Sequence, residues 1–180
     1  MRKLFLLVVI VMAAITASAQ EGIYLGGGIS LWRNNDVDKT SFSITPDVGY
    51  NLSEKWAVGV ELAYAHNGYD GDKLNSNAFA LAPYARYSFY ENKIVRLFLD
   101  MGFGFSTYKE KHAESVNGFE IGVKPGLAVK LNDNFSFITK VGFAGYRDDY
   151  YRDDYYRGEE NGFGVGLDGE NISIGIEYEF

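Results

Sequence analysis

The stretch YNLSEKWAVGVELAY, residues 50–64, decides the fold class of this chain. After a short polar turn at residues 53–55, apolar side chains alternate with small or charged ones. One face carries Trp56, Val58, Val60, Leu62 and Tyr64. The other face carries Ala57, Gly59, Glu61 and Ala63. A period of two residues is typical of a β-strand with one apolar face.

The same alternation recurs along the chain and predicts eight strands. The other segments are residues 22–32, 41–52, 79–89, 95–105, 119–131, 135–143 and 171–180. Tight turns at residues 53–55, 91–93 and 132–134 alternate with four long polar connections. Short turns on one side and long loops on the other are typical of transmembrane β-barrels. Pro46, Pro83 and Pro125 occupy equivalent positions in three strands, which predicts a shared bulge or bend there.

The face that points outward is predicted from the kinds of side chain on each face. A soluble lipocalin-type barrel would turn its apolar face inward. Here the polar face holds mainly glycine, alanine and serine with single charges, which suits a narrow filled interior. The apolar face has aromatic residues near both strand ends, as in the double aromatic girdle of a membrane barrel. These are Tyr50, Trp56, Tyr87, Phe89 and Phe135 near the short turns, and Phe42, Tyr64, Phe79, Phe105 and Phe119 near the long connections.

The N-terminus has the pattern of a secretory signal peptide. Arg2 and Lys3 precede the apolar run at residues 4–15, which is shorter than the ~20 residues of a membrane-spanning helix. The small residues of ASAQ, residues 17–20, suit cleavage after Ala19. We therefore expect a signal peptide at residues 1–19 and a β-barrel domain at residues 20–180. Because the last predicted strand ends at Phe180, we expect no separate periplasmic domain and no peptidoglycan-binding role.

Composition excludes several classes of function. The 180 residues contain no cysteine, which excludes disulfides and thiolate metal sites. The net charge is −7, and loss of Arg2 and Lys3 leaves 15 basic against 24 acidic residues. We therefore expect no nucleic-acid partner. No motif in the sequence indicates a cofactor.

The chain resembles the eight-stranded outer-membrane β-barrels of Gram-negative bacteria, the OmpA/OmpX-like class of the porin family. The resemblance rests on the signal peptide, on turn-strand units such as residues 50–64 and VKLNDNFSFITKVGF at 129–143, and on the final ISIGIEYEF at 172–180. It implies an outer-membrane location, and the even number of predicted strands puts both termini on the side of the short turns, which we expect to be the periplasm. It also implies contact with membrane lipid and lipopolysaccharide, a monomeric state, and a C-terminal signal, at Tyr178 and Phe180, for the barrel-assembly machinery.

The charges on the predicted inner face form the first candidate site. They are Asp47, Glu61, Asp100, Glu120 and Glu177, with Arg86, Arg96, Lys124, Lys130 and Lys140. An eight-stranded barrel has an interior that side chains just fill, and unpaired charges there would be costly. We therefore expect a salt-bridged network with a structural role. A small gated conductance pathway is the alternative.

An outer-membrane lipid-modifying enzyme is the leading enzymatic alternative. A hydrolase would need a nucleophile, a base and an orienting group near the rim of the long connections. His66, His112, Glu114 and Ser115 could supply them, although their spacing does not demand it. We expect no enzymatic activity.

The repeat GYRDDYYRDDYYRGEENG, residues 145–162, falls in the fourth long connection. Its period of five suits neither a strand nor an amphipathic helix, which favours a solvated tip. Loops rich in tyrosine are also binding surfaces. A surface-recognition loop for an extracellular protein would comprise Tyr146, Arg147, Asp148, Asp149, Tyr150, Tyr151, Arg152, Asp153, Asp154, Tyr155, Tyr156 and Arg157. Calcium binding by Asp148, Asp149, Asp153, Asp154, Glu159 and Glu160 is a third interpretation.

The function expected from the sequence is a structural or surface-interaction role in the outer membrane. The alternatives are the lipid-modifying enzyme, the gated pathway, and a soluble exported barrel that binds a small ligand.

Overall fold

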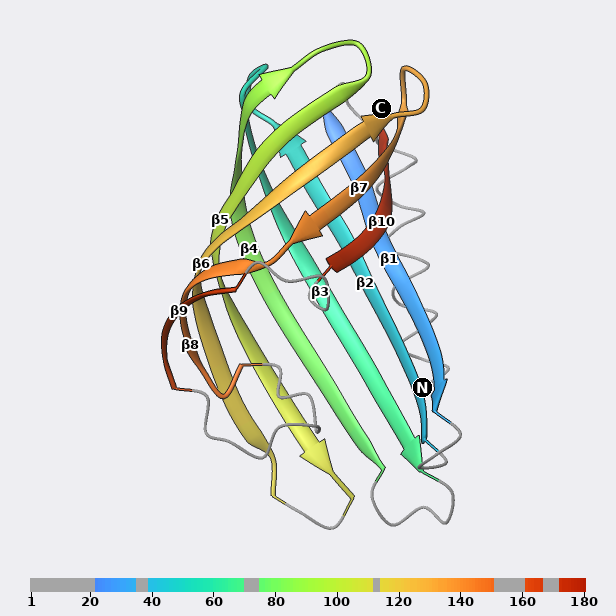
Figure 1. Ribbon diagram of the computed structural model, residues 1–180, viewed down its shortest axis with the longest axis vertical. Helices are drawn as coiled ribbons and strands as arrows, with labels where there is room; N and C mark the ends of the chain where they lie inside the picture. Colours follow the sequence, from blue (N-terminus) through green and yellow to red (C-terminus); the bar gives the residue numbers. More distant parts are fainter. Residues whose placement is uncertain (1–21, 35–38, 70–74, 112–113, 151–160, 167–171) are drawn as a thin grey trace.

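The computed structural model is a ring of antiparallel strands with residues 22–34, 39–69, 75–111, 114–150, 161–166 and 172–180 described (Figure 1). Its strand segments are β1 (Ile23–Asn34), β2 (Lys39–Asn51), β3 (Trp56–Tyr69), β4 (Ser76–Glu91), β5 (Val95–Glu110), β6 (Val116–Lys130), β7 (Phe135–Val141), β8 (Phe143–Asp148), β9 (Gly162–Gly166) and β10 (Ile172–Glu179). The predicted signal peptide, residues 1–19, lies outside the described residues. Among those residues, no helix has the length and apolar character needed to cross a membrane.

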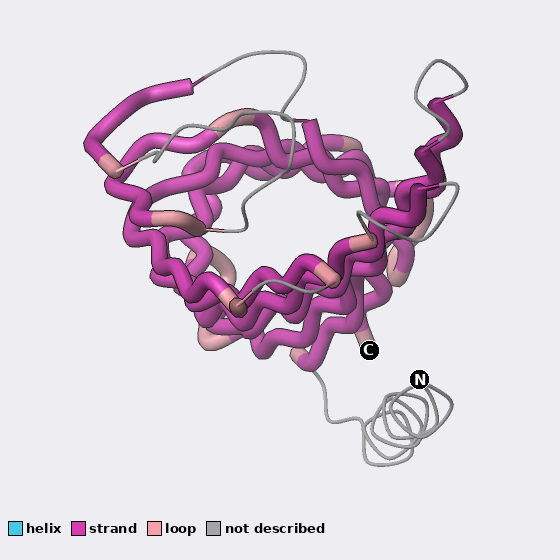
Figure 2. The backbone as a smooth tube through the Cα atoms, turned by 90° about the horizontal axis from the view of Figure 1, so that it is seen from below, coloured by secondary structure: helices cyan, strands magenta, loops and turns pink. Residues whose placement is uncertain are grey.

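From β1 to β7, each strand pairs with the next one in the sequence. β8 pairs with β6 and β9, and β10 pairs with β7 and β1, which joins the two ends of the wall on the side of the short turns. The segments β7 and β8 continue one another along β6, and β9 and β10 supply the final wall strand. β10 lies between β7 and β1, and β5 pairs with β6. Figure 2 looks along the resulting ring. The predicted fold class, an eight-stranded antiparallel up-and-down barrel, is confirmed.

The two faces of the wall carry opposite kinds of side chain. Large apolar residues such as Val58, Phe103 and Phe137 are exposed on the outside. The most buried large side chains inside include the charged Arg86 and the polar Tyr24. A soluble barrel has the reverse arrangement, so the outer face suits lipid and the inner face must satisfy its own charges.

A β-bulge at Gly142 changes the direction of the side chains in the seventh wall strand. Two residues of β6, Lys124 and Pro125, oppose the three residues from Val141 to Phe143. Gly142 has φ of +71°, which glycine adopts without strain. The predicted unbroken alternation through Phe143 is therefore wrong, because the extra residue turns the Phe143 ring inward, against Gly122 and Gly145.

The same bulge turns Tyr146 outward. Its ring packs against Phe119 at 5.6 Å and against Phe163 of β9 at 4.9 Å between centroids. Aromatic packing therefore attaches the β8–β9 hairpin to the outer face of β6.

The three prolines share an interruption of pairing and not a common bulge. Pairing with the next strand skips Pro46 in β2, Pro83 in β4 and Pro125 in β6, each with the residue before it. The register is unchanged across the first two positions. Only Pro125 lies opposite an extra residue. That residue is in the facing strand, at the bulge around Gly142 between β7 and β8.

Candidate functional site

Arg86 is the centre of the charged interior. The alternation of β4 turns it inward, and its side chain is 2% exposed. Its Nε donates to Asp100 Oδ1 at 2.7 Å, and its Nη2 donates to Oδ2 at 3.1 Å. Arg86 and Asp100 are register partners on β4 and β5, so strand pairing itself places the fork against the carboxylate. A planar guanidinium matched to two carboxylate oxygens is among the strongest hydrogen-bonded pairs in proteins.

Glu177 joins this pair to the opposite wall. The Nη1 of Arg86 donates to Glu177 Oε2 at 2.6 Å, and the Nη2 of Arg96 donates to Oε1 at 2.5 Å. Glu177 lies on β10, which β3, β2 and β1 separate from β4 in the wall. One carboxylate therefore braces β10 against both β4 and β5 across the lumen.

Lys140 forms a second cross-brace from β7. Its Nζ lies 2.9 Å from Glu61 and 3.1 Å from Asp100. Asp47 is more distant, at 3.9 Å, and accepts a hydrogen bond of 2.7 Å from the Tyr84 hydroxyl. Since Asp100 contacts both Arg86 and Lys140, the two braces form one network.

Glu120 organises a smaller cluster nearer the long connections. It accepts from Lys124 at 2.6 Å and from the Nε of Arg147 at 2.9 Å. Tyr150 follows β8, and its ring lies 5.9 Å from the Lys124 ammonium. Burial and the neighbouring Glu120 carboxylate raise the pKa of the Tyr150 hydroxyl. This cluster holds two cations on one carboxylate.

Three inward aromatic rings fill the space around the network, and each lies over a glycine. The register partners are Tyr24 with Gly49, Tyr84 with Gly59, and Phe98 with Gly126. A Cβ atom at any of these glycines would overlap the partner's ring. A ring that covers a cross-strand glycine restores the packing that glycine lacks.

The same rings surround the Arg86 guanidinium. Its central carbon lies 4.1 Å from the Phe98 centroid, 5.3 Å from Tyr24 and 5.4 Å from Tyr84. Aromatic faces attract a cation, and the attraction is larger where water is excluded. The rings therefore compensate the guanidinium for part of its lost hydration.

The ten charges predicted for the interior separate into three groups. Seven form the central network: Asp47, Glu61, Arg86, Arg96, Asp100, Lys140 and Glu177. Glu120 and Lys124 form the cluster near the long connections. Lys130 lies apart from both groups, at the rim of the short turns, where it pairs with Glu91.

Sequence reasoning missed the interior roles of Tyr24, Tyr84, Phe98 and Arg147. The first three could be found from the glycine that faces each aromatic across a strand pair. Arg147 is assigned to the exposed tip by its place in the repeat, and this assignment is wrong. The bulge at Gly142 extends the wall through Asp148 and turns Arg147 inward.

The other described residues of the predicted surface-recognition loop lie on β8 and just after it. Tyr146 packs on the outer face of β8, and Asp148 ends that strand. Asp149 has a φ of 47°, and the Tyr150 ring approaches Gly104 of β5. Residues 151–157 lie outside the described residues. In the described ranges, no group of three or more histidine, aspartate or glutamate side chains is placed to hold a metal ion.

The C-terminal aromatic residues cluster at the rim of the short turns. Tyr178 lies 4.7 Å from Phe135 and 4.8 Å from Phe180 between ring centroids. Phe180 N–H also donates to the Ile23 carbonyl at 3.0 Å, which joins the chain end to β1.

Substitution of Lys130 by methionine should change the free energy of unfolding by less than about 1 kcal/mol. Its pair with Glu91 is partly exposed, so water can replace the lost partner. Urea-induced unfolding of the barrel in phospholipid vesicles measures the effect. A loss above about 2 kcal/mol would show that the rim pair belongs energetically to the buried network.

Comparison with known proteins agrees with this architecture. The family model for the outer membrane protein beta-barrel domain matches residues 4–180. The N-terminal β-barrel domain of Pseudomonas aeruginosa OprF has a TM-score of 0.50 at 16% identity, over 89% of this chain and 98% of that one. Ail, the attachment invasion locus protein of Yersinia pestis, has a TM-score of 0.44 at 18% identity, over 89% and 100%. No curated protein matches. Because the family model spans nearly the whole sequence, the chain belongs to the family of outer membrane protein β-barrel domains.

Proposed function

We propose that this barrel has a structural or surface-interaction role in the outer membrane and is not an enzyme. It is a monomer in contact with lipid and lipopolysaccharide, and the barrel-assembly machinery reads its C-terminal aromatics. Four long connections point outward, and both termini lie in the periplasm. The observation that carries this proposal is the cross-bracing of the lumen by Arg86, Asp100 and Glu177. Walls fixed to one another by buried ion pairs support a rigid scaffold for surface loops.

The surroundings of the described histidine favour this role over hydrolysis. The Nδ1 of His66 lies 2.9 Å from Asn77 Oδ1, which also accepts from the Tyr64 hydroxyl at 2.9 Å. Asparagine also orients the catalytic histidine of some hydrolases, so what counts against hydrolysis is that the described contact of His66 is with this amide and not with a serine hydroxyl. His112 lies outside the described residues, and Glu114 and Ser115 are exposed.

Membrane topology is testable with single cysteines because the chain has none of its own. Ser115→Cys, before β6, should react with a membrane-impermeant maleimide on intact cells. Asp133→Cys, in the short turn after β6, should react only after the outer membrane is permeabilised. The two sites lie at opposite ends of one strand and serve as mutual controls. The reverse labelling pattern would contradict the proposed orientation.

The surface-interaction role is testable by removal of residues 151–160. Cells that carry the shortened barrel should lose adhesion to an extracellular protein layer, such as immobilised matrix protein, compared with cells that carry the full chain. Labelling at Ser115→Cys in both backgrounds controls for the amount at the surface. Equal adhesion at equal surface amount would leave only the structural role. Altered lipid A masses in cells with the intact barrel, absent with His66→Ala, would instead support the enzyme.

A further inference from the structure

In the part of the chain that the structure describes, strand pairing is missing at one place in the wall, on the side of the long connections. β1 pairs with β10 from Tyr24 to Gly27. Beyond Gly27, the pairings of β1 within the described residues are with β2 alone. β9 likewise pairs with β8 alone in the described part of the chain. Figure 1 shows β9 at the left edge of the barrel and β1 at the right edge, with β2 and β3 visible between them.

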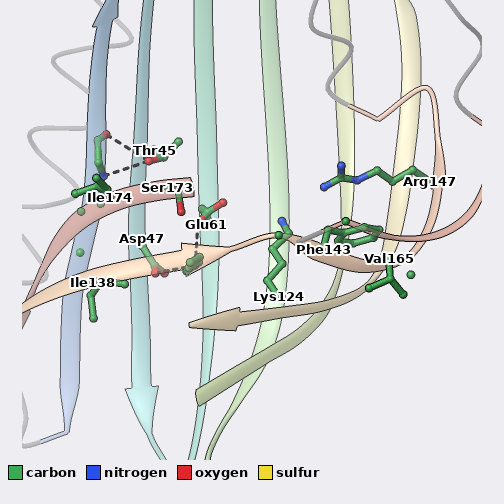
Figure 3. Close-up of a pocket in the computed structure, with 18 of the residues that line it drawn as sticks. Thr45, Asp47, Glu61, Lys124, Ile138, Phe143, Arg147, Val165, Ser173 and Ile174 are labelled. Carbon is green, nitrogen blue, oxygen red and sulfur yellow. Dashed lines mark hydrogen bonds and ion pairs between the residues drawn. The ribbon is translucent and has the colours of Figure 1, made fainter. Parts of the chain in front are cut away.

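This opening leads into a cavity of about 520 Å³ that reaches the charged interior (Figure 3). The volume lies in the range of small-molecule sites. The inner side of β9 is formed by Gly162, Gly164 and Gly166, and a Cβ atom at any of these would meet nothing within 4 Å. By contrast, Gly49, Gly59 and Gly126 are each covered by an aromatic ring. On β9 the three glycines have no side chain that would obstruct the cavity.

The outer margins of the opening are strongly apolar. Ile29 on β1 is 79% exposed, and Phe163 on β9 is 87% exposed. Val165, next on the same face of β9, is 75% exposed. In a membrane this face meets hydrocarbon. A molecule that enters here must therefore have an apolar part that stays between these side chains.

The inner end of the cavity has cations available to an anion. Lys124 and Arg147 point toward each other from β6 and β8 (Figure 3), and both are ion-paired to the single carboxylate of Glu120. Their side chains remain 25% and 36% exposed. By contrast, Lys140 lies deeper among three carboxylates, those of Glu61, Asp100 and Asp47. Glu61 also attracts Lys124, but the ion pairs of Lys124 and Arg147 share one carboxylate, so positive charge gathers at these two side chains.

We propose that the gap between β1 and β9 is a lateral portal for a single-chain anionic amphiphile of the fatty-acid type. Its carboxylate binds Lys124 and Arg147 inside the barrel, and its acyl chain passes out between Ile29 and Phe163 into the membrane. A carboxylate on a guanidinium and an ammonium makes charge-assisted hydrogen bonds, which supply the affinity. The proposal requires a membrane location but not the surface-interaction role, so either can fail alone.

The test is binding of palmitate bearing a nitroxide on its acyl chain to the full barrel in phospholipid nanodiscs, followed by electron paramagnetic resonance. The expected result is saturable binding, weakened at least about tenfold by Arg147→Gln, since one charge-assisted hydrogen bond gives a factor of this size. Gly164→Trp should also weaken binding at least about tenfold, because its side chain would extend from β9 into the cavity while both cations are kept in the chain. The methyl ester of the same acid has no carboxylate. Its binding to the unaltered barrel should therefore be as weak as the binding of the acid to the Arg147→Gln variant.

Lys130→Gln is the matched control, because it removes a cation at the other rim and should leave binding unchanged. Heat-modifiable gel mobility confirms that each variant is a closed barrel. Gly164→Trp keeps the proposal falsifiable if Arg147→Gln does not fold. Absence of saturable binding to the unaltered barrel would overturn the proposal. If the ester and the acid bound the unaltered barrel equally well, the carboxylate site would be overturned. If the acid bound Gly164→Trp as well as the unaltered barrel, the lateral route would be overturned.

Discussion

Replacement of Arg86 by methionine should lower the free energy of unfolding by about 3–5 kcal/mol. The substitution keeps much of the side-chain volume but leaves Asp100 and Glu177 buried without their guanidinium. A buried carboxylate that loses its partner retains its full desolvation cost. Urea-induced unfolding in phospholipid vesicles measures the change, and Lys130→Met provides the matched loss of a rim cation. A change within about 1 kcal/mol of the unaltered barrel would show that the brace does not stabilise the fold.

The pair with Asp100 can be isolated by a double-mutant cycle. Asp100→Leu alone leaves Arg86 with Glu177 as its acidic partner. Combined with Arg86→Met, it removes both charges together and should cost less than the sum of the two single changes. The coupling should be at least about 1.5 kcal/mol. Additive losses would show that the two side chains act independently in spite of their contact.

Gly126→Val should destabilise the barrel by about 1–3 kcal/mol because its Cβ would occupy the space of the Phe98 ring. The same unfolding measurement applies. Phe98→Ala in the same chain vacates that space, so the double variant should lose less than the sum of the two single losses. Gly162→Val is the matched control, because nothing lies within 4 Å of its Cβ position. Equal losses at Gly126 and Gly162 would contradict the interlocking of ring and glycine.

The sequence was sufficient for the fold class because the strands repeat a period of two, with aromatic residues near many of the strand ends. That pattern depends only on local spacing, and it also identified most of the charges that face inward, with Arg147 missed. It could not divide those charges into groups, because partners such as Arg86 and Glu177 come from strands on opposite sides of the ring.

The seventh and eighth wall strands were the least predictable part. The φ of Gly142 decides which way Phe143, Tyr146 and Arg147 point, and a period of two does not reveal an inserted residue. β9 was hidden for a different reason. Its sequence, GFGVG, alternates over only five residues and pairs with one neighbour in the described chain, so its signal was too short to separate from the loop.

We infer that the apolar face of this barrel meets lipid while the face carrying the charges is enclosed. Methyl NMR in nanodiscs with a lipid-borne nitroxide tests it without a substitution. Leu81 and Ala80 are adjacent on β4 and lie at nearly the same depth, with exposures of 41% and 1%. The signals of Leu81 and Ile121 should broaden, while those of Ala80 and Ala128 should persist. Broadening of the alanine methyls with the Leu81 signal intact would contradict the account.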